Sequence, residues 1–267
     1  MEAIYRALLE KKWMYVVSDT LTMVERNLIR YVRLPQLLIF STIQPVMFLL
    51  LFTYVFGGAI RVTGSYIDYL LPGILVQSAV FGAIQTGVGL TEDMAKGLID
   101  RFRSLPMARA AVLAGRTLAD TMRNIFVILL MFGVGSLIGF RIGGSVSDAV
   151  LAFAILLLFG FAFSWISATI GLLVKNVETA QVAGFIWVFP LVFASSVFVP
   201  VETMPDWLRV FAEINPISVT VNAVRMLLLG YTDAAETARL AWLAVVWIVG
   251  ILGVFMPLAI RLYRRAA

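Results

Sequence analysis

Six long stretches without a charged side chain constrain the fold of this sequence more than any other feature. A helix that crosses the hydrocarbon core of a bilayer needs roughly 20 mainly apolar residues, because no water is available there to solvate a charge or an unpaired backbone group. The 267 residues have a mean hydropathy of +0.95, and only 14% of them are charged. We therefore predict an all-α integral membrane protein with six transmembrane helices. The uncharged stretches are 34–60, 69–91, 124–140, 149–174, 179–201 and 240–260.

The third stretch has 17 residues, which is short for a crossing. We expect its helix to extend backward through Arg116, Asp120 and Arg123. The spacings of four and three residues place these side chains on one face of a helix, where they can pair near the membrane surface.

The basic residues predict the orientation in the membrane. Segments on the cytoplasmic side retain Lys and Arg during insertion. If both termini are cytoplasmic, the inner segments carry 16 of the 21 Lys and Arg and the outer segments carry 5. We therefore predict a multi-pass protein of the cell (plasma) membrane with cytoplasmic N and C termini. The pI of about 9.7 then follows from topology and does not indicate a nucleic-acid partner.

Residues 1–36 are too polar to cross the membrane and too regular to be a tail. We predict an amphipathic helix on the inner membrane surface, with Ser18 as its N-cap and Pro35 at its end. It forms one domain with the six-span region 37–267. Two roles stay open for it, a membrane anchor and a docking element for a partner. Its apolar stripe is Val17, Leu21, Val24, Leu28 and Val32.

The stretch 92–106, directly after the second span, has the pattern of a cytoplasmic amphipathic helix. Thr91 or Asp93 is the expected N-cap, and Pro106 ends the helix. A loop that rests on lipid headgroups would explain the arginines, but an anionic surface would repel the acidic residues, so a protein partner suits the pattern better. The apolar stripe is Met94, Leu98, Phe102 and Leu105, and the charged stripe is Glu92, Lys96, Asp100 and Arg103.

The outer segment 200–238 is long enough to contain structure of its own. Thr203 is the expected cap of a first short helix. Asn215-Pro216 then breaks the chain, and Gly230 ends a second helix. We therefore predict two short extracellular helices in this segment.

Several absences narrow the function. None of the four lysines follows a glycine, so the chain lacks the Gly-Lys-Ser/Thr loop that cradles ATP phosphates, and we expect neither ATPase activity nor a cofactor on it. Without Cys or His it has no thiol chemistry and none of the common zinc sites, so we expect no metal site. No span carries a charge near its centre, where ion-coupled carriers commonly place one. A self-sufficient carrier or channel and a membrane-embedded enzyme stay open as alternatives.

Amides and aromatic rings inside the spans are candidates for a substrate route. Interhelical hydrogen bonding is the favoured alternative for the amides, and contact with lipid or with other helices is the alternative for the rings. These candidates are Gln44, Gln77, Gln85, Phe189 and Phe193.

Small residues four positions apart predict close helix packing. Gly135 and Gly139 form a Gly-x-x-x-Gly step, and Ala83 with Gly87 forms a weaker relative of it. We expect helices to approach closely at both places.

Two stretches carry a resemblance to a known family. They are GLIDRFRSLPMARAAVLAGR, which follows the second span, and FVPVETMPDWLRVFAEINPISVTVNAVR, which precedes the last one. Together with the N-terminal helix and the six spans, they resemble the membrane subunits of type-two ATP-binding-cassette exporters, in particular the daunorubicin-resistance permease group. The resemblance covers nearly the whole chain.

The resemblance implies a half-transporter. Two such permeases, identical or related, would work with two copies of a cytoplasmic ATPase subunit, and ATP and Mg would bind to that partner. The cargo would be an amphiphilic or hydrophobic molecule moved outward, and a drug-like molecule, a lipid and a glycoconjugate are all open.

The resemblance also implies roles for two groups of residues. The helix at 92–106 would be the coupling helix that contacts the ATPase, and the outer helix pair would cap the exit of the pathway. The coupling residues would be Glu92, Met94, Leu98, Asp100, Arg101, Phe102, Arg103, Leu105 and Pro106. The extracellular gate would be Pro205, Trp207, Asn215, Pro216 and Arg225.

Overall fold

The computed structural model describes residues 2–60, 62, 64–98, 109–174, 176–230 and 233–265, and every regular element in these ranges is helical. The all-α prediction is therefore confirmed for the described part of the chain. The α-helices are α1 (Glu2–Arg33), α2 (Pro35–Leu51), α3 (Tyr66–Ala95), α5 (Arg109–Ile138), α6 (Val146–Leu173), α7 (Val177–Phe193), α8 (Asp206–Ile214), α9 (Pro216–Leu229) and α10 (Ala234–Arg265). A π-helical turn, η1 (Phe52–Phe56), extends α2, and a 3-10 turn, η2 (Val201–Thr203), precedes α8.

Five helices in the described ranges are long and apolar enough to cross a membrane: α2 with η1, α3, α5, α6 and α10. They coincide with five of the six predicted spans, which identifies a multi-pass membrane protein. The fifth predicted span forms α7, an apolar helix of 17 residues. The helix α5 begins at Arg109, so the third span does extend backward through Arg116 as predicted.

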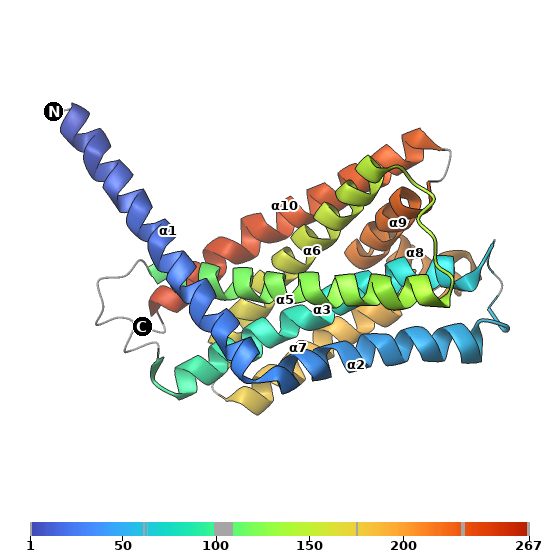
Figure 1. The fold of residues 1–267 in the computed structure, drawn as a ribbon, viewed down its shortest axis with the longest axis horizontal. Coiled ribbons are helices and arrows are strands. Elements are labelled where there is room, and N and C mark those ends of the chain that lie inside the picture. The colour runs from blue at the N-terminus through green and yellow to red at the C-terminus, as the bar shows by residue number, and fades with distance from the viewer. Residues whose placement is uncertain are drawn as a thin grey trace.

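The helix α3 is the axis of the bundle, and α5, α6, α7 and α9 all pack against it (Figure 1). Of its most apolar 18 residues, 78% are buried inside the protein, against 6% for the span that contains α2. Other helices therefore cover most of α3, whereas α2 lies at the edge of the bundle.

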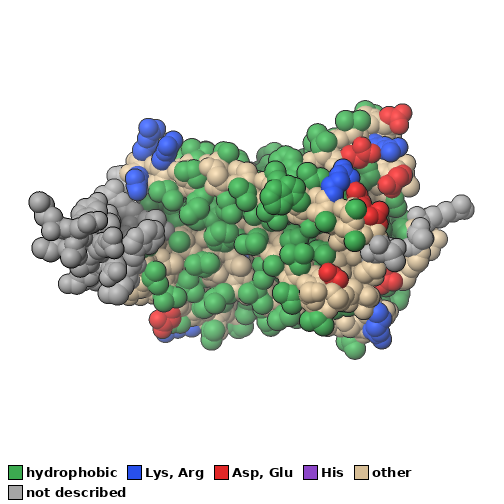
Figure 2. All heavy atoms as spheres, turned by 90° about the horizontal axis from the view of Figure 1, so that it is seen from above, with side chains coloured by type: hydrophobic (Ala, Val, Ile, Leu, Met, Phe, Trp, Pro, Cys, Tyr) green, Lys and Arg blue, Asp and Glu red, His purple; other side chains and the backbone are tan. Residues whose placement is uncertain are grey.

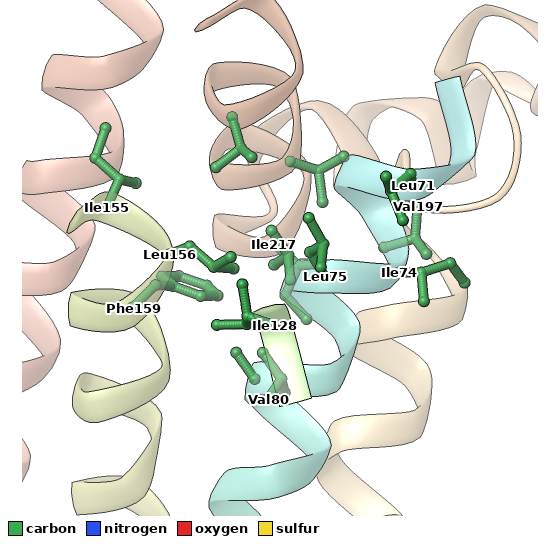
Figure 3. Packing of buried hydrophobic residues seen from close by; sticks show 14 of the residues in the cluster. Leu71, Ile74, Leu75, Val80, Ile128, Ile155, Leu156, Phe159, Val197 and Ile217 are labelled. Carbon is green, nitrogen blue, oxygen red and sulfur yellow. The ribbon is translucent and has the colours of Figure 1, made fainter. Parts of the chain in front are cut away.

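The main core lies where α3, α5, α6 and α9 meet (Figure 3). Leu75 of α3, Ile128 of α5, Phe159 of α6 and Ile217 of α9 are each at most 1% exposed. Burial of an aliphatic or aromatic side chain contributes roughly 1.5–3 kcal/mol, so this contact region holds the long helices together.

The two ends of the bundle differ. The start of α1, the end of α3 and the end of α10 lie at one end, whereas α8 and α9 lie at the other (Figure 1). Hydrophobic side chains cover the middle of the long dimension on the face in Figure 2, and charged side chains gather toward the two ends. A band of this kind matches the hydrocarbon layer of a bilayer.

The N-terminal helix differs from the prediction. It is one helix from Glu2 to Arg33, so Ser18 lies inside it and is not an N-cap. Its buried face includes Met23, which packs on α5 at Gly115, where an added Cβ would lie 2.3 Å from the Met23 Cβ. Only Val24 of the predicted stripe is fully buried, and Val17, Leu21 and Val32 are more than half exposed. Contact with α5, which the local pattern does not reveal, decides the buried face.

The segment after the second span also differs. No new helix starts at Thr91 or Asp93, because α3 continues through both to Ala95. The Thr91 hydroxyl donates to the carbonyl oxygens of Gly87 at 3.0 Å and of Gly171 at 2.9 Å instead of capping a helix. The chain then turns at Gly97, which has the left-handed φ of +65°. The remainder of the predicted helix, from residue 99 onward, lies outside the described residues.

One predicted close approach is confirmed and the other is half wrong. Gly87 of α3 packs on the backbone of α6, where an added Cβ would lie 2.3 Å from the Ser167 carbonyl oxygen. Gly135 rests against the Leu71 side chain, but Gly139 has no neighbour within 4 Å. With a φ of +122°, Gly139 follows the end of α5, so its small size serves a turn and not a helix contact.

Replacement of Gly87 by alanine should destabilise the bundle. We expect Gly87→Ala to lower the free energy of unfolding by about 1–3 kcal/mol, because the new methyl group overlaps the backbone of α6. The matched control is Gly133→Ala in α5, where nothing lies within 4 Å and alanine favours the helix. Denaturant titration of the purified protein in detergent measures both; equal stability of the two variants would contradict the close approach.

Candidate functional site

A cavity of about 500 Å³ lies between α1, α2, α3, α5 and α7. Its volume is within the range of sites that bind small molecules. The apolar part of the wall includes Phe40, Phe81, Ile84, Val88, Val127 and Phe185. The polar and charged part includes Asn27, Arg30, Ser41, Gln44, Gln77, Ser78, Gln85, Glu92, Arg116, Arg123 and Asn124. The cavity is therefore amphiphilic.

The three glutamines proposed for a substrate route come together in this wall, although they belong to α2 and α3. The two phenylalanines do not line it. Phe189 and Phe193 stack on each other with ring centroids 4.5 Å apart and are 47% and 39% exposed. Phe189 contacts the wall residue Phe81 in an edge-to-face arrangement but is not itself part of the wall.

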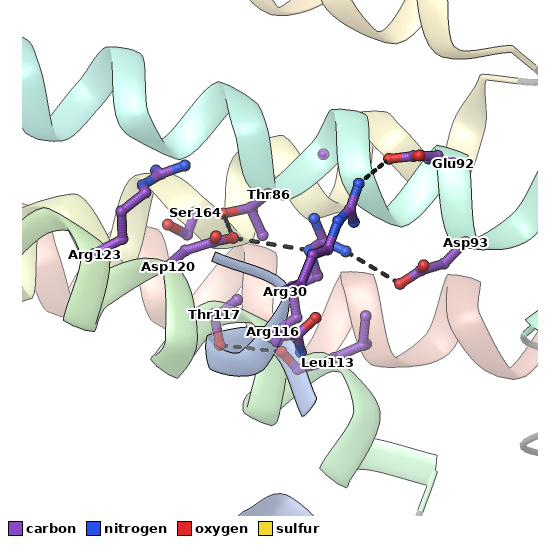
Figure 4. A network of polar contacts seen from close by, with 12 residues as sticks. Arg30, Thr86, Glu92, Asp93, Leu113, Arg116, Thr117, Asp120, Arg123 and Ser164 are labelled. Atoms are coloured by element: carbon purple, nitrogen blue, oxygen red, sulfur yellow. Dashed lines mark hydrogen bonds and ion pairs between the residues drawn. The ribbon is translucent and has the colours of Figure 1, made fainter. Parts of the chain in front are cut away.

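A network of charged side chains borders the cavity and joins α1, α3 and α5 (Figure 4). Arg116 of α5 donates to the Asp93 carboxylate of α3 at 3.1 Å, and Arg26 of α1 reaches the same carboxylate at 3.4 Å. Glu92 accepts from Arg30 of α1 at 2.5 Å and from Lys96 at 2.6 Å. Three helices are thus tied together by two neighbouring carboxylates.

The Asp120 carboxylate is the third acidic group of the network and is 1% exposed. It accepts from the Thr86 hydroxyl at 2.6 Å and from the Tyr31 hydroxyl, and Arg116 Nε lies 3.9 Å away. Burial and the Asp120 charge raise the pKa of Tyr31, so the phenol stays protonated and remains a donor to Asp120. Burial opposes the charge on Arg30, but its bond with Glu92 prevails and raises the Arg30 pKa.

Two glycines of α3 make room for the arginines of α5. An added Cβ at Gly89 would lie 1.6 Å from Arg116 Nη2. An added Cβ at Gly82 would lie 3.2 Å from Arg123 Nη2 and 2.5 Å from Asn124 Oδ1. The arginines reach across the surface of α3 only because these positions have no side chain.

The residues predicted to contact an ATPase divide into two groups. Glu92 and Met94 make contacts within this chain, since Glu92 binds Arg30 and Lys96 and Met94 packs on a second core cluster. The acidic residues at 92 and 93 are therefore explained by internal ion pairs, which corrects the argument that they indicate a protein partner. Leu98 is half-buried after the turn at Gly97. Asp100, Arg101, Phe102, Arg103, Leu105 and Pro106 lie outside the described residues.

The outer helix pair is present as α8 and α9, and Gly230 ends α9 in the left-handed conformation with a φ of +67°. Thr203 does not cap α8, because it lies in η2 and donates to the Pro200 carbonyl. Pro205 is instead the residue before α8, and Trp207 of α8 is 76% exposed.

The other three residues of the predicted gate have anchoring contacts. The Asn215 side chain caps α9, which starts at Pro216, and donates to the carbonyls of Leu191 and Ala194. Arg225 lies 3.7 Å above the Tyr69 ring and donates to the Tyr69 and Ser196 carbonyls. These bonds attach α9 to α3 and to the end of α7.

The sequence reasoning missed the charged network as a unit. The spacing of Arg116, Asp120 and Arg123 predicted pairing on one face of α5. Arg116 does lie 3.9 Å from Asp120, whereas Arg123 has no carboxylate within 4 Å among the described residues. Tyr31, Thr86 and Asp93 come from helices whose contacts no local pattern specifies. The available signal was the charge inside the third helix, because a charge at that depth requires a partner.

An amphiphilic cavity among apolar membrane helices fits a membrane transport protein, and comparison with known proteins gives the family. Residues 18–229 match the ABC-2 type transporter family. The chain therefore belongs to that family and is a transmembrane permease subunit of an ATP-binding-cassette transporter.

Individual relatives agree with this assignment. The chain is 38% identical over 250 residues to the daunorubicin resistance ABC transporter permease protein DrrB1 of Streptomyces coeruleorubidus, across 93% of this chain and 87% of that protein. It is 28% identical over 260 residues to the probable doxorubicin resistance permease DrrC of Mycobacterium tuberculosis, across 94% and 90%. The putative transport permease ycf38 of Cyanophora paradoxa is 26% identical over 219 residues, across 80% and 75%.

Removal of a carboxylate from the charged network should lower the free energy of unfolding more than removal of a surface carboxylate. Asp93→Ala leaves Arg116 buried beside a more distant acid, and we expect a loss of about 3 kcal/mol in the free energy of unfolding. Glu213→Ala removes an exposed pair with Arg209 and should change this energy by about 0–1 kcal/mol. Denaturant titration in detergent compares the two, and similar losses would show that the network does not hold the helices.

Proposed function

We propose that this permease is one half of an exporter that moves an amphiphilic or hydrophobic molecule outward, a drug-like molecule or a lipid, with energy from ATP hydrolysed by a separate cytoplasmic subunit. The observation that carries the proposal is the amphiphilic cavity of about 500 Å³ in a chain of this family. Apolar wall residues suit the body of such a molecule, and the amides and arginines suit its polar end. The drug-resistance names of two relatives support a drug-like cargo.

The ATPase contact belongs at the segment between α3 and α5. Residues 96–108 join the end of α3 to the start of α5, and these helices are linked by the pair of Asp93 with Arg116. A partner that moves this segment therefore displaces two walls of the cavity together. ATP and Mg bind on the partner, and two copies of it serve two permeases.

The second permease, identical or related, belongs beside α2. Only 6% of the most apolar 18 residues of this span are buried inside the protein. Exposed residues on α2 that do not line the cavity include Ile39, Ile43, Met47 and Leu50. A second permease or lipid is needed to cover this apolar surface.

The proposed orientation follows from charge. Six crossings, with α7 as the fifth, place both termini and the end of α3 in the cytoplasm of a cell with this protein in its plasma membrane. The basic residues support this arrangement, because 16 of 21 fall on the inner side. The outer pair α8 and α9 then lies at the extracellular end of the cavity-forming helices.

The test is co-purification from the native host. We expect an ATPase subunit to elute with the tagged chain in about equal amount, and Phe102→Asp with Leu105→Asp to remove it, because charges there disrupt an apolar contact. The matched control changes two exposed apolar residues at the other end, Trp207→Asp with Val210→Asp, and should keep the ATPase bound. Recovery of the permease alone, or equal loss in both variants, would contradict the proposed interface.

A further inference from the structure

We propose that the cavity binds amphiphiles whose polar end is an oxyanion, a carboxylate or a phosphate, and that Arg123 is the residue that pairs with it. The proposal rests on the proposed function and names the class of substrate. The arginines around the cavity differ in their partners: Arg30 and Arg116 each pair with a carboxylate, and Arg123 does not among the described residues.

Arg123 is 5% exposed, and it lines the cavity from α5. Its Nη2 donates to the Gly82 carbonyl at 2.8 Å and lies 3.4 Å from Asn124 Oδ1. Its Nε is buried and has no hydrogen-bond partner among the described residues. The guanidinium group has five donors, so several of them stay available for a ligand.

The carboxylates nearby are already engaged by other cations. Glu92 pairs with Arg30 and Lys96, and Asp93 pairs with Arg26 and Arg116. Asp120 accepts from Thr86 and Tyr31 and has Arg116 as its nearest cation. In the described part of the chain, no carboxylate lies within 4 Å of an Arg123 nitrogen.

A buried charge without a counter-charge is costly, because removal from water is not offset by a partner. The Tyr31 ring, 5.6 Å from the Arg123 guanidinium carbon, offsets a small part of that cost. An oxyanion in the cavity would offset it with charge-assisted hydrogen bonds, and arginine suits carboxylate and phosphate because two parallel N–H groups match two oxygens.

Gln77 supports the same site from α3. It is 4% exposed and lines the cavity, and its Oε1 has no hydrogen-bond partner among the described residues. A buried amide oxygen of this kind calls for a donor. A hydroxyl or amide N–H close to the oxyanion of the ligand would satisfy it.

The rest of the wall suits an apolar body and disfavours a cation. Phe81 and Phe185 form an aromatic pair with ring centroids 5.8 Å apart. Three arginines and a single acidic residue, Glu92, line the cavity within the described residues. A cationic head would meet this positive excess, whereas an anionic head would be attracted by it.

The first experiment uses the unmodified full chain in phosphatidylcholine nanodiscs, with dansyl-labelled undecanoate as a fluorescent probe. We expect decanoate to displace the probe at a concentration about tenfold or more below that of decyltrimethylammonium, which has the same tail and the opposite charge. Acetate should not displace it, since it lacks the apolar body. If decanoate and decyltrimethylammonium displaced the probe equally well, the cavity would not prefer an anion. If acetate displaced the probe as well as decanoate, the cavity would not require an apolar body.

The second experiment assigns the site. Arg123→Gln should weaken undecanoate binding about tenfold or more and change binding of its methyl ester less than twofold, while Arg123→Lys retains part of the preference. The matched control Arg239→Gln removes an exposed arginine of α10 and should change neither. If Arg123→Gln weakened the binding of undecanoate and of its methyl ester equally, Arg123 would have only a structural role. No ATPase is present, so failure here is separate from failure of the proposed half-transporter.

Discussion

The buried pair of Asp93 and Arg116 is the interaction on which the rest of the structure depends. Each group would be costly to bury alone, and together with Arg26 they fix one carboxylate of α3 between cations of α1 and α5. This contact sets the register of three helices at the end of the bundle where α3 stops. The same contact defines the border of the cavity and the positions from which residues 96–108 leave α3 and enter α5.

The charged network and the cavity form one unit with two properties. Most charged groups of the network have an ion-pair partner, so the network holds the helices rigidly together. Because the surroundings have low polarity, replacement of one partner lowers the free energy of unfolding. Arg123 lies next to this network, and no carboxylate pairs with it among the described residues. In our proposal, a movement of α3 and α5 together, caused by the ATPase, therefore also moves the group that holds the substrate.

Features that depend on long uniform patterns, such as the membrane-crossing helices, could be predicted from the sequence. Helix ends and buried faces that depend on contacts between helices could not. Charge-free length located five helices of crossing length, and the three glutamines that it singled out do meet in one cavity. It placed a helix start at Thr91 or Asp93, because both residue types cap helices, yet Thr91 bonds to Gly171 of another helix, Asp93 pairs with Arg116, and α3 continues through both. The buried face of α1 likewise follows from the glycine at 115 on α5, which is distant in sequence.

The most direct test of the proposed mechanism determines on which side of the membrane the end of α3, with its charged network, lies. The chain contains no cysteine, so single cysteines at two exposed positions, Lys96→Cys and Arg209→Cys, can be labelled with a membrane-impermeant maleimide. We expect intact cells to label Arg209→Cys, and Lys96→Cys to react only after the membrane is permeabilised. Labelling of Lys96→Cys in intact cells would place the end of α3 outside, out of reach of any cytoplasmic ATPase, and would contradict the account.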